Sequence, residues 1–233
     1  MAVTKIILVI LIIVLPTFAI GCGEEEEEEL AGTWRDDFDD GNLAGWKMAT
    51  CLWMQNLVTP DSGNWVVEDG AAVGGDDDVS TRYDLYTGDV SWTDYTAEVI
   101  VKLTKELGLC PHHTSVWLGV RSQGGDKFGL GSYAVGLVSV YGVESAEVLT
   151  YDNGQFFDLQ RITFPAQVDT WYRLKMEVSG NQVRAFVDDT KVGEFQSDTF
   201  TSGSVNIGAD GVRAMFDDFE ATGLGIPNGG PGL

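Results

Sequence analysis

The chain has 233 residues, and its 36 acidic side chains against 14 basic ones give a formal net charge of -22. Such an acidic surface repels phosphate backbones and anionic lipid headgroups, which excludes nucleic acid as a partner. Hydrophobic residues make up 44% of the sequence, so a full core can form, and the length suits a single all-β domain.

The first residues have the pattern of a secretory signal peptide. Lys5 precedes an apolar run from Ile6 to Leu15, and small residues lie before Cys22. The run is shorter than the roughly 20 residues that span a membrane. Ala19-Ile20-Gly21-Cys22 resembles the lipobox of bacterial lipoproteins, in which the cysteine is lipidated and becomes the N-terminus. We predict a signal peptide over 1–21 and lipidation of Cys22, with an ordinary cleaved signal peptide as the alternative.

Residues 22–31 follow as an acidic tether. Glu24 to Glu29 repel one another and include nothing that packs, which is typical of an extended spacer. The lipid on Cys22 would make the membrane a partner. Gly23 after the cysteine favours the outer membrane under the usual enterobacterial sorting pattern. We expect a protein of the cell envelope that faces the periplasm or the exterior.

Three cysteines occur in the chain, and lipidation of Cys22 leaves Cys51 and Cys110. An even pair in an exported chain predicts a disulfide, and two free thiols are the alternative. Cys110 stands in Cys110-Pro111-His112-His113, but a structural zinc site needs four ligands and the chain has only two histidines. Zinc is therefore not expected.

Short alternating runs separated by turn residues fill the rest of the chain. Tyr95, Ala97, Val99, Val101 and Leu103 share one face, and the same period of two recurs at Val116–Val120 and at Val205–Ile207. This alternation predicts an all-β sandwich of antiparallel sheets. We expect one domain over 32–223, followed by a Gly/Pro-rich tail over 224–233.

One hairpin can be assigned in register. Gly180-Asn181 is a two-residue turn between the runs 171–179 and 182–188. Folding there pairs Val178 with Val183 and Glu177 with Arg184, which puts apolar pairs on one face and opposite charges on the other.

Several segments resemble the concanavalin A-like jelly rolls of the 3-keto-disaccharide hydrolase and laminin-G-like families. They are the opening Phe38-Asp39-Asp40-Gly41-Asn42-Leu43-Ala44-Gly45-Trp46, then 65–70, 94–99, the hairpin from Trp171 to Asp188, and the closing 215–220. The resemblance implies a jelly-roll β-sandwich of two antiparallel sheets and a carbohydrate partner. The Glu-x-Asp-x-Glu triplet of related endoglucanases does not occur in the sequence, so no catalytic residue is assigned.

We therefore predict a lipid-anchored, exported protein that binds extracellular or cell-surface glycan. The alternatives are a glycoside-cleaving enzyme of the 3-keto-disaccharide hydrolase type and a structural envelope protein without a small ligand. Aromatic rings stack on sugars and guanidinium groups bind hydroxyls. The candidate glycan-binding residues are Trp117, Arg121, Arg173 and Phe186, all at positions that alternate with core residues.

In related jelly rolls the first and last strands lie side by side and often hold a calcium ion. Acidic residues occur near both ends of this domain, and calcium takes oxygen ligands. The resemblance thus implies calcium as a candidate cofactor, with Asp39 and Asp217 as ligands. A solvated acidic turn is the alternative.

Overall fold

The structure is a computed structural model that describes residues 31–52, 57–60, 63–76, 81–104, 113–124, 131–140, 143–152 and 155–230. In these ranges the ordered elements are strands, and no helix there is long and apolar enough to cross a membrane. Cys22, Cys110 and the signal peptide lie outside the described residues. Of Cys51 only the backbone is described, so the anchor, the tether and the disulfide stay predictions.

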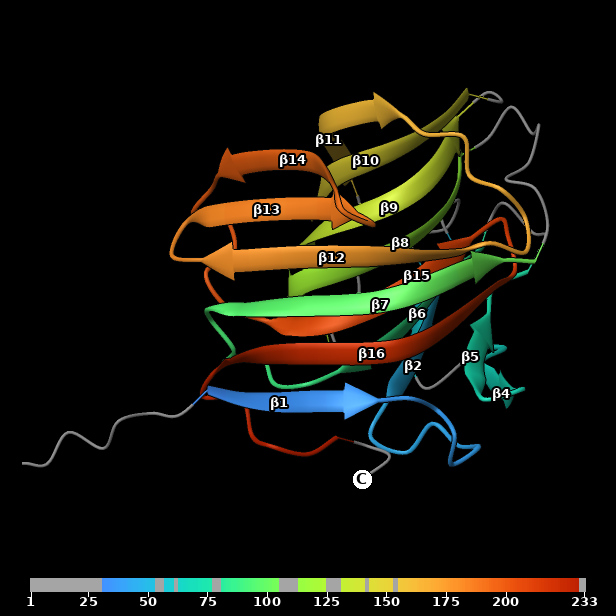
Figure 1. Ribbon diagram of the computed structural model, residues 1–233, viewed down its shortest axis with the longest axis horizontal. Helices are drawn as coiled ribbons and strands as arrows, with labels where there is room; N and C mark the ends of the chain where they lie inside the picture. Colours follow the sequence, from blue (N-terminus) through green and yellow to red (C-terminus); the bar gives the residue numbers. More distant parts are fainter. Residues whose placement is uncertain are drawn as a thin grey trace, which may run out of the picture.

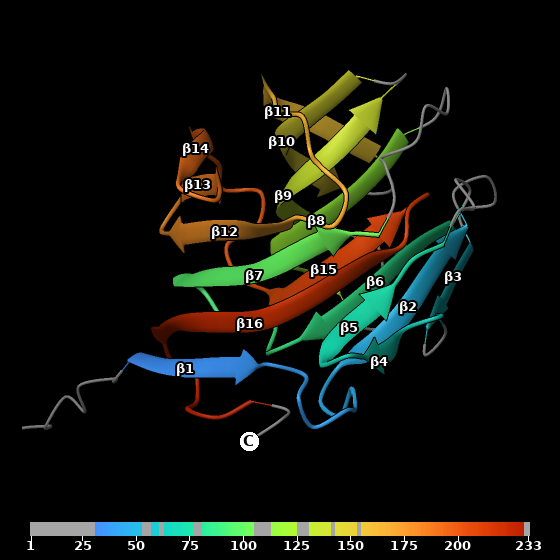
Figure 2. The ribbon, with the colours of Figure 1, turned by 45° about the vertical axis from the view of Figure 1, so that its right-hand side comes forward.

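Two eight-stranded antiparallel sheets pack face to face, which confirms the predicted fold class (Figures 1 and 2). Sheet A has the order β14-β13-β12-β7-β16-β5-β4, with β1 paired to β16. Its strands are β1 (Ala31–Asp36), β4 (Val66–Glu68), β5 (Ala71–Gly74), β7 (Tyr95–Leu103), β12 (Trp171–Ser179), β13 (Gln182–Val187), β14 (Thr190–Gln196) and β16 (Ala214–Leu224).

Sheet B has the order β11-β10-β9-β8-β15-β6-β2-β3. Its strands are β2 (Lys47–Leu52), β3 (Leu57–Pro60), β6 (Thr81–Thr87), β8 (His113–Ser122), β9 (Gly131–Val140), β10 (Val143–Asp152), β11 (Gln155–Thr163) and β15 (Ser204–Asp210). In Figure 1 strands β12, β7, β16 and β1 of sheet A lie in front of strands β9, β8, β15 and β6 of sheet B.

The period of two in the sequence produces the core between the sheets. Along β7, residues Tyr95 to Leu103 alternate between buried and half-buried, and the buried set packs against Leu118 of β8 and Ile207 of β15 in the same core cluster. Side chains of the other parity therefore face outward from each sheet, where a ligand can meet them.

The predicted hairpin is confirmed in register. Val178 pairs with Val183 and Glu177 with Arg184, and Gly180 has φ 54° in the turn. A positive φ is available to glycine at no steric cost, which is why the turn occurs there.

The N-terminal strand β1 is held on both edges. On one side it pairs with β16, from Ala31 opposite Leu224 to Asp36 opposite Phe219. On the other side the Arg35 amide donates to the Gly229 carbonyl and the Gly229 amide to the Thr33 carbonyl, both at 3.0 Å. The described part of the Gly/Pro-rich tail thus packs against β1, which lies beside β16 in both ribbon views.

Candidate functional site

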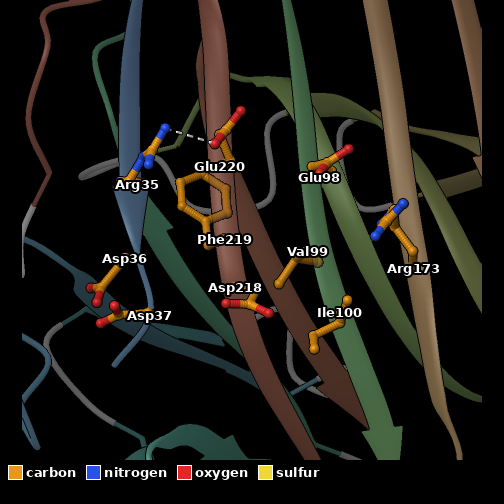
Figure 3. Close-up of a pocket in the computed structure, with 10 residues that line it drawn as sticks. All are labelled: Arg35, Asp36, Asp37, Glu98, Val99, Ile100, Arg173, Asp218, Phe219 and Glu220. Carbon is orange, nitrogen blue, oxygen red and sulfur yellow. Dashed lines mark ion pairs between the residues drawn. The ribbon is translucent and has the colours of Figure 1, made fainter. Parts of the chain in front are cut away.

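A pocket of about 320 Å³ lies on the outer face of sheet A, across β1, β16, β7 and β12. We call it the β16 pocket. It is within the size range of small-ligand sites, roughly 300–1,000 Å³. The residues that line it are Arg35, Asp36, Asp37, Glu98, Val99, Ile100, Arg173, Asp218, Phe219 and Glu220 (Figure 3).

A β-bulge in β16 shapes the pocket. Asp217 pairs with Ile100 of β7, but the next paired residue is Glu220, opposite Glu98, so the register shifts between them. Asp218 takes φ 48° in the bulge. A bulge re-aims side chains and interrupts the ladder, and here Asp218 becomes part of the pocket lining (Figure 3).

Of the charged side chains that line the β16 pocket, only Arg35 and Glu220 form an ion pair among the described residues, so Arg173 and Glu98 lack a charged partner there. The Arg173 guanidinium extends from β12 toward β7, and Glu98 lies on the outer side of β7 (Figure 3). Because Arg173 pairs with Ile100 and Lys175 with Glu98, Arg173 and Glu98 are diagonal neighbours on one face. Arg35, in contrast, is 3.1 Å from Glu220 in an ion pair. Arg173 and Glu98 are therefore available to a ligand.

Two carboxyl groups at the edge of the pocket have raised pKa values. Burial is the largest cause of the rise for Asp36, although its oxygens accept hydrogen bonds from Trp46 Nε1 at 2.7 Å and from the Phe38 amide at 2.8 Å. Burial also raises the pKa of Asp217, and the charges of Asp218, Asp39 and Asp37 add to it. Negative potential thus accumulates where β1 meets β16.

These shifts predict that moderate acid stabilises the fold. A carboxyl whose folded pKa lies above its unfolded value of 3.8 binds more protons when folded, so stability falls as pH rises through the folded pKa. The pKa of Glu177 is lowered instead, because Lys175 donates a hydrogen bond to the Glu177 carboxylate. The stability that Glu177 contributes is therefore lost as the pH falls below its unfolded pKa of 4.5. The melting temperature should therefore rise as the pH is lowered from neutral through the folded pKa values of Asp36 and Asp217, and fall again well below the unfolded Glu177 value of 4.5.

Circular dichroism at constant ionic strength measures this profile. Asp217→Asn should flatten the rise between neutral pH and the maximum. A melting temperature that falls steadily from pH 7 downward would contradict the assignment.

Asp39 and Asp217, the predicted calcium ligands, lie close enough for Asp39 to raise the pKa of Asp217. In the described part of the chain, however, no three histidine, cysteine or acidic side chains are grouped in a way that could hold a metal ion. Calcium usually takes six to eight oxygens. The calcium site stays a prediction, and no mechanism is built on it.

The four predicted glycan-binding residues do not share one face of the molecule. Arg173 and Phe186 face outward from sheet A, whereas Trp117 and Arg121 belong to β8 of sheet B. Of the four, only Arg173 lines the β16 pocket. Phe186 lies two strands from Glu98, half-buried, with Lys175 Nζ 5.4 Å from its ring centroid.

Arg121 is 1% exposed, and its guanidinium binds backbone carbonyls. Its Nε and Nη2 donate to the Thr93 carbonyl at 3.0 and 2.8 Å, and its Nη1 donates to the Phe200 carbonyl at 3.0 Å. These bonds join β8 to two connecting segments, so Arg121 has a structural role in this conformation.

Trp117 occupies the middle of a cross-strand row on the outer face of sheet B. Gly136 of β9 and Gly208 of β15 flank it, and Glu147 and Asp84 lie one strand further out. A Cβ atom on Gly208 would come 2.2 Å from the indole, so glycine is required beside the ring. The Arg82 guanidinium lies 4.6 Å from the Trp117 ring centroid in a cation–π contact, and the ring is only 6% exposed.

The polar groups of this row are buried and mostly paired. Arg82 Nε and Nη2 donate to Asp84 at 2.6 and 2.8 Å, and Asn206 Nδ2 donates to it at 2.7 Å. Burial still raises the pKa of Asp84, and the Arg82 charge opposes that rise. The adjoining hollow measures about 10 Å³, room for about one water molecule. In this conformation the row has no space for a sugar.

Asp84 and Glu147 are also too far apart to act as a glycosidase pair. Four strand spacings separate them, or about 19 Å at ~4.8 Å per spacing. Facing carboxyl groups in glycosidases lie about 5–9.5 Å apart.

Glu98, Ile100 and Glu220 line the pocket but were not predicted from the sequence as site residues. One signal was available in the sequence: Phe216 and Phe219 are separated by two aspartates, which breaks the period of two. The structure buries both phenylalanines. Such a break indicates a bulge, although it does not show which strand lies beside it.

The fold is a concanavalin A-like jelly-roll sandwich with a pocket of about 320 Å³ on the outer face of sheet A. The family model of the 3-keto-alpha-glucoside-1,2-lyase-like domain matches residues 33–220. The chain belongs to this family. No protein with a curated description matches it in sequence.

Solved structures with the same fold include both binding modules and enzymes. The carbohydrate-binding module CBM66 from Bacillus subtilis has a TM-score of 0.58 at 19% identity, covering 77% of this chain and 96% of its own. The catalytic domain of an endo-1,3-beta-glucanase (laminarinase) from Thermotoga petrophila RKU-1 has a TM-score of 0.55 at 13% identity, with 82% and 97% covered. The laminarinase from Rhodothermus marinus has a TM-score of 0.57 at 14% identity, and the match covers 83% of this chain and 96% of the laminarinase.

Proposed function

We propose that this protein binds carbohydrate in the β16 pocket and that a lipid on Cys22 holds it at the cell envelope. One observation carries the binding proposal: an open pocket of about 320 Å³ presents the Arg173 guanidinium together with the carboxylates of Glu98 and Asp218. Guanidinium groups donate and carboxylates accept, which is the combination that sugar hydroxyls require. The family and the glycan-binding neighbours support the same ligand class.

Removing Arg173 should weaken binding by about 10-fold or more, because a hydrogen bond to a charged group contributes about 1.5–3 kcal/mol. The full chain, purified in a detergent without a sugar headgroup, is screened on a glycan array. Affinities of the retained glycans are then measured by calorimetry for the parent protein and for Arg173→Ala.

Arg184→Ala is the matched control. Arg184 lies on the same sheet but outside the pocket, paired with Glu177 at 3.1 Å, and its loss should leave the affinity unchanged. Retention of no glycan would reject the proposal and favour a structural envelope protein. If Arg173→Ala bound the glycan with the same affinity as the parent protein, the binding site would lie outside the β16 pocket.

A glycoside-cleaving enzyme is the second candidate, favoured by the family to which the chain belongs. Asp217 pairs with Ile100 of the pocket lining and has a raised pKa, so its carboxyl group would be the proton donor. Mass spectrometry of the incubated glycans and of their 3-keto derivatives separates the two roles. Release of a shorter product, lost in Asp217→Asn while binding is retained, would establish the enzyme.

A further inference from the structure

Negative charge exceeds positive charge in the β16 pocket. Five carboxylates line it against two guanidinium groups. One of the two guanidinium groups, that of Arg35, is already paired with Glu220. A ligand that enters the pocket therefore meets more unpaired carboxylates than unpaired cations.

The pairing of β7 with β16 keeps two like charges side by side. Glu98 and Glu220 are directly opposite each other across the two strands. Like charges at such positions destabilise a sheet. Arg35 relieves Glu220, whereas Glu98 has no cation partner among the described residues, since Lys175, its neighbour on β12, is 2.8 Å from Glu177 instead. A bound cation would remove this repulsion.

The bulge adds a further carboxylate to the same cavity. Asp218 is exposed and projects into the lining, between Asp37 on the β1 side and Ile100 on β7 (Figure 3). Asp37 and Asp218 line the same cavity as Glu98, so their negative charges add there. A cation placed beside Asp218 would be attracted by several groups at once.

The spacing of these carboxylates suits an organic cation better than a metal ion. Within the described ranges, no three of them come together as metal ligands. They lie around a cavity that also includes the Ile100 side chain and the Arg173 guanidinium. An ammonium group has three donors for carboxylates, and neighbouring hydroxyls can accept from Arg173.

We propose that the β16 pocket selects saccharides that carry a free amine over their N-acetylated, neutral and acidic counterparts. This inference rests on the proposed function and adds the ligand class. The ammonium group binds between Glu98 and Asp218, Arg173 binds the ring hydroxyls, and an acidic sugar is repelled.

Calorimetry on the full chain in the same detergent tests this selectivity. We compare four oligosaccharides of equal length. The repeating unit carries an amine in the first, an N-acetyl group in the second, only hydroxyls in the third and a carboxylate in the fourth. The amine-bearing oligomer should bind about 10-fold tighter than the neutral one, as expected for one charge-assisted contact. The difference in affinity between the amine-bearing and neutral oligomers should become smaller as the salt concentration is raised from about 0.05 to about 0.5 M.

Glu98→Gln is the decisive variant, because it keeps the shape of the side chain and removes its charge. It should abolish the preference for the amine-bearing oligomer over the neutral one, and raise the melting temperature by removing the repulsion from Glu220. Glu177→Gln, on the same sheet but outside the pocket, should keep the preference.

The outcomes separate the two proposals. Equal affinity for the amine-bearing and neutral oligomers, or a preference that survives Glu98→Gln, would overturn the selectivity while carbohydrate binding stands. Binding of none of the four oligomers would overturn both. Tighter binding of the acidic oligomer would overturn the proposed selectivity for amines and show that the Arg173 charge alone determines which sugars the pocket prefers.

Discussion

Replacing Arg82 with alanine should lower the free energy of unfolding by about 3–5 kcal/mol, the typical cost of breaking a buried ion pair by removing one partner. Arg82 is 3% exposed and Asp84 is fully buried, with two charge-assisted hydrogen bonds between them. The variant leaves the Asp84 carboxylate buried with Asn206 as its remaining described donor. Urea unfolding followed by tryptophan fluorescence measures the loss.

A double-mutant cycle identifies the cause. Asp84→Ala alone should also destabilise, but Arg82→Ala/Asp84→Ala should cost less than the two single variants added together, because neither charge is then left unpaired. A loss below about 1 kcal/mol in Arg82→Ala would mean that Asp84 is solvated or protonated in the native state. Strict additivity would show that the two groups are not coupled.

The second large effect is expected at Trp46, which supports the β1 side of the pocket. Its ring lies 5.6 Å from the Phe38 ring and 5.0 Å from the Phe219 ring, and its Nε1 donates to Asp36. Trp46→Ala removes this packing and a donor to a buried carboxyl group. The expected loss is about 3–5 kcal/mol, measured by chemical unfolding.

Trp46→Phe separates packing from hydrogen bonding. It keeps an aromatic ring and removes only the Nε1 donor, so it should cost about 1–3 kcal/mol. It should also raise the pKa of Asp36 further, since the Trp46 bond opposes that rise. If Trp46→Phe were as damaging as Trp46→Ala, the hydrogen bond and not the packing would be the main term.

Alternation of side chains was sufficient to predict the strands, the hairpin register and the fold class, because these depend on local periodicity and on one tight turn. It was not sufficient to predict the site. Trp117 and Arg173 both alternate with core residues, yet they face opposite sides of the sandwich, since the order of strands within a sheet is set by long-range pairing. Alternation also does not reveal that an outward face is covered, as at Trp117.

The β16 pocket depends on contacts between distant parts of the chain. It requires β1 beside β16, nearly 190 residues later, and a bulge whose register is visible only when β7 is known to be its partner. The acidic residues at both ends of the domain were recognised from the sequence. Their assembly with Glu98 and Arg173 into one cavity could not be predicted from spacing.

The double support of β1 has a mechanical consequence. Any pull on the residues that precede Ala31 is transmitted first to β1, and a ligand held in the β16 pocket would supply the opposing force through β16 and β7. A pull that acts along the strands is perpendicular to the ladder bonds, which run across an antiparallel pair. The bonds from Ala31 to Asp36 therefore share the load in shear instead of opening one at a time. The Gly229 contacts on the other edge of β1 add resistance to peeling.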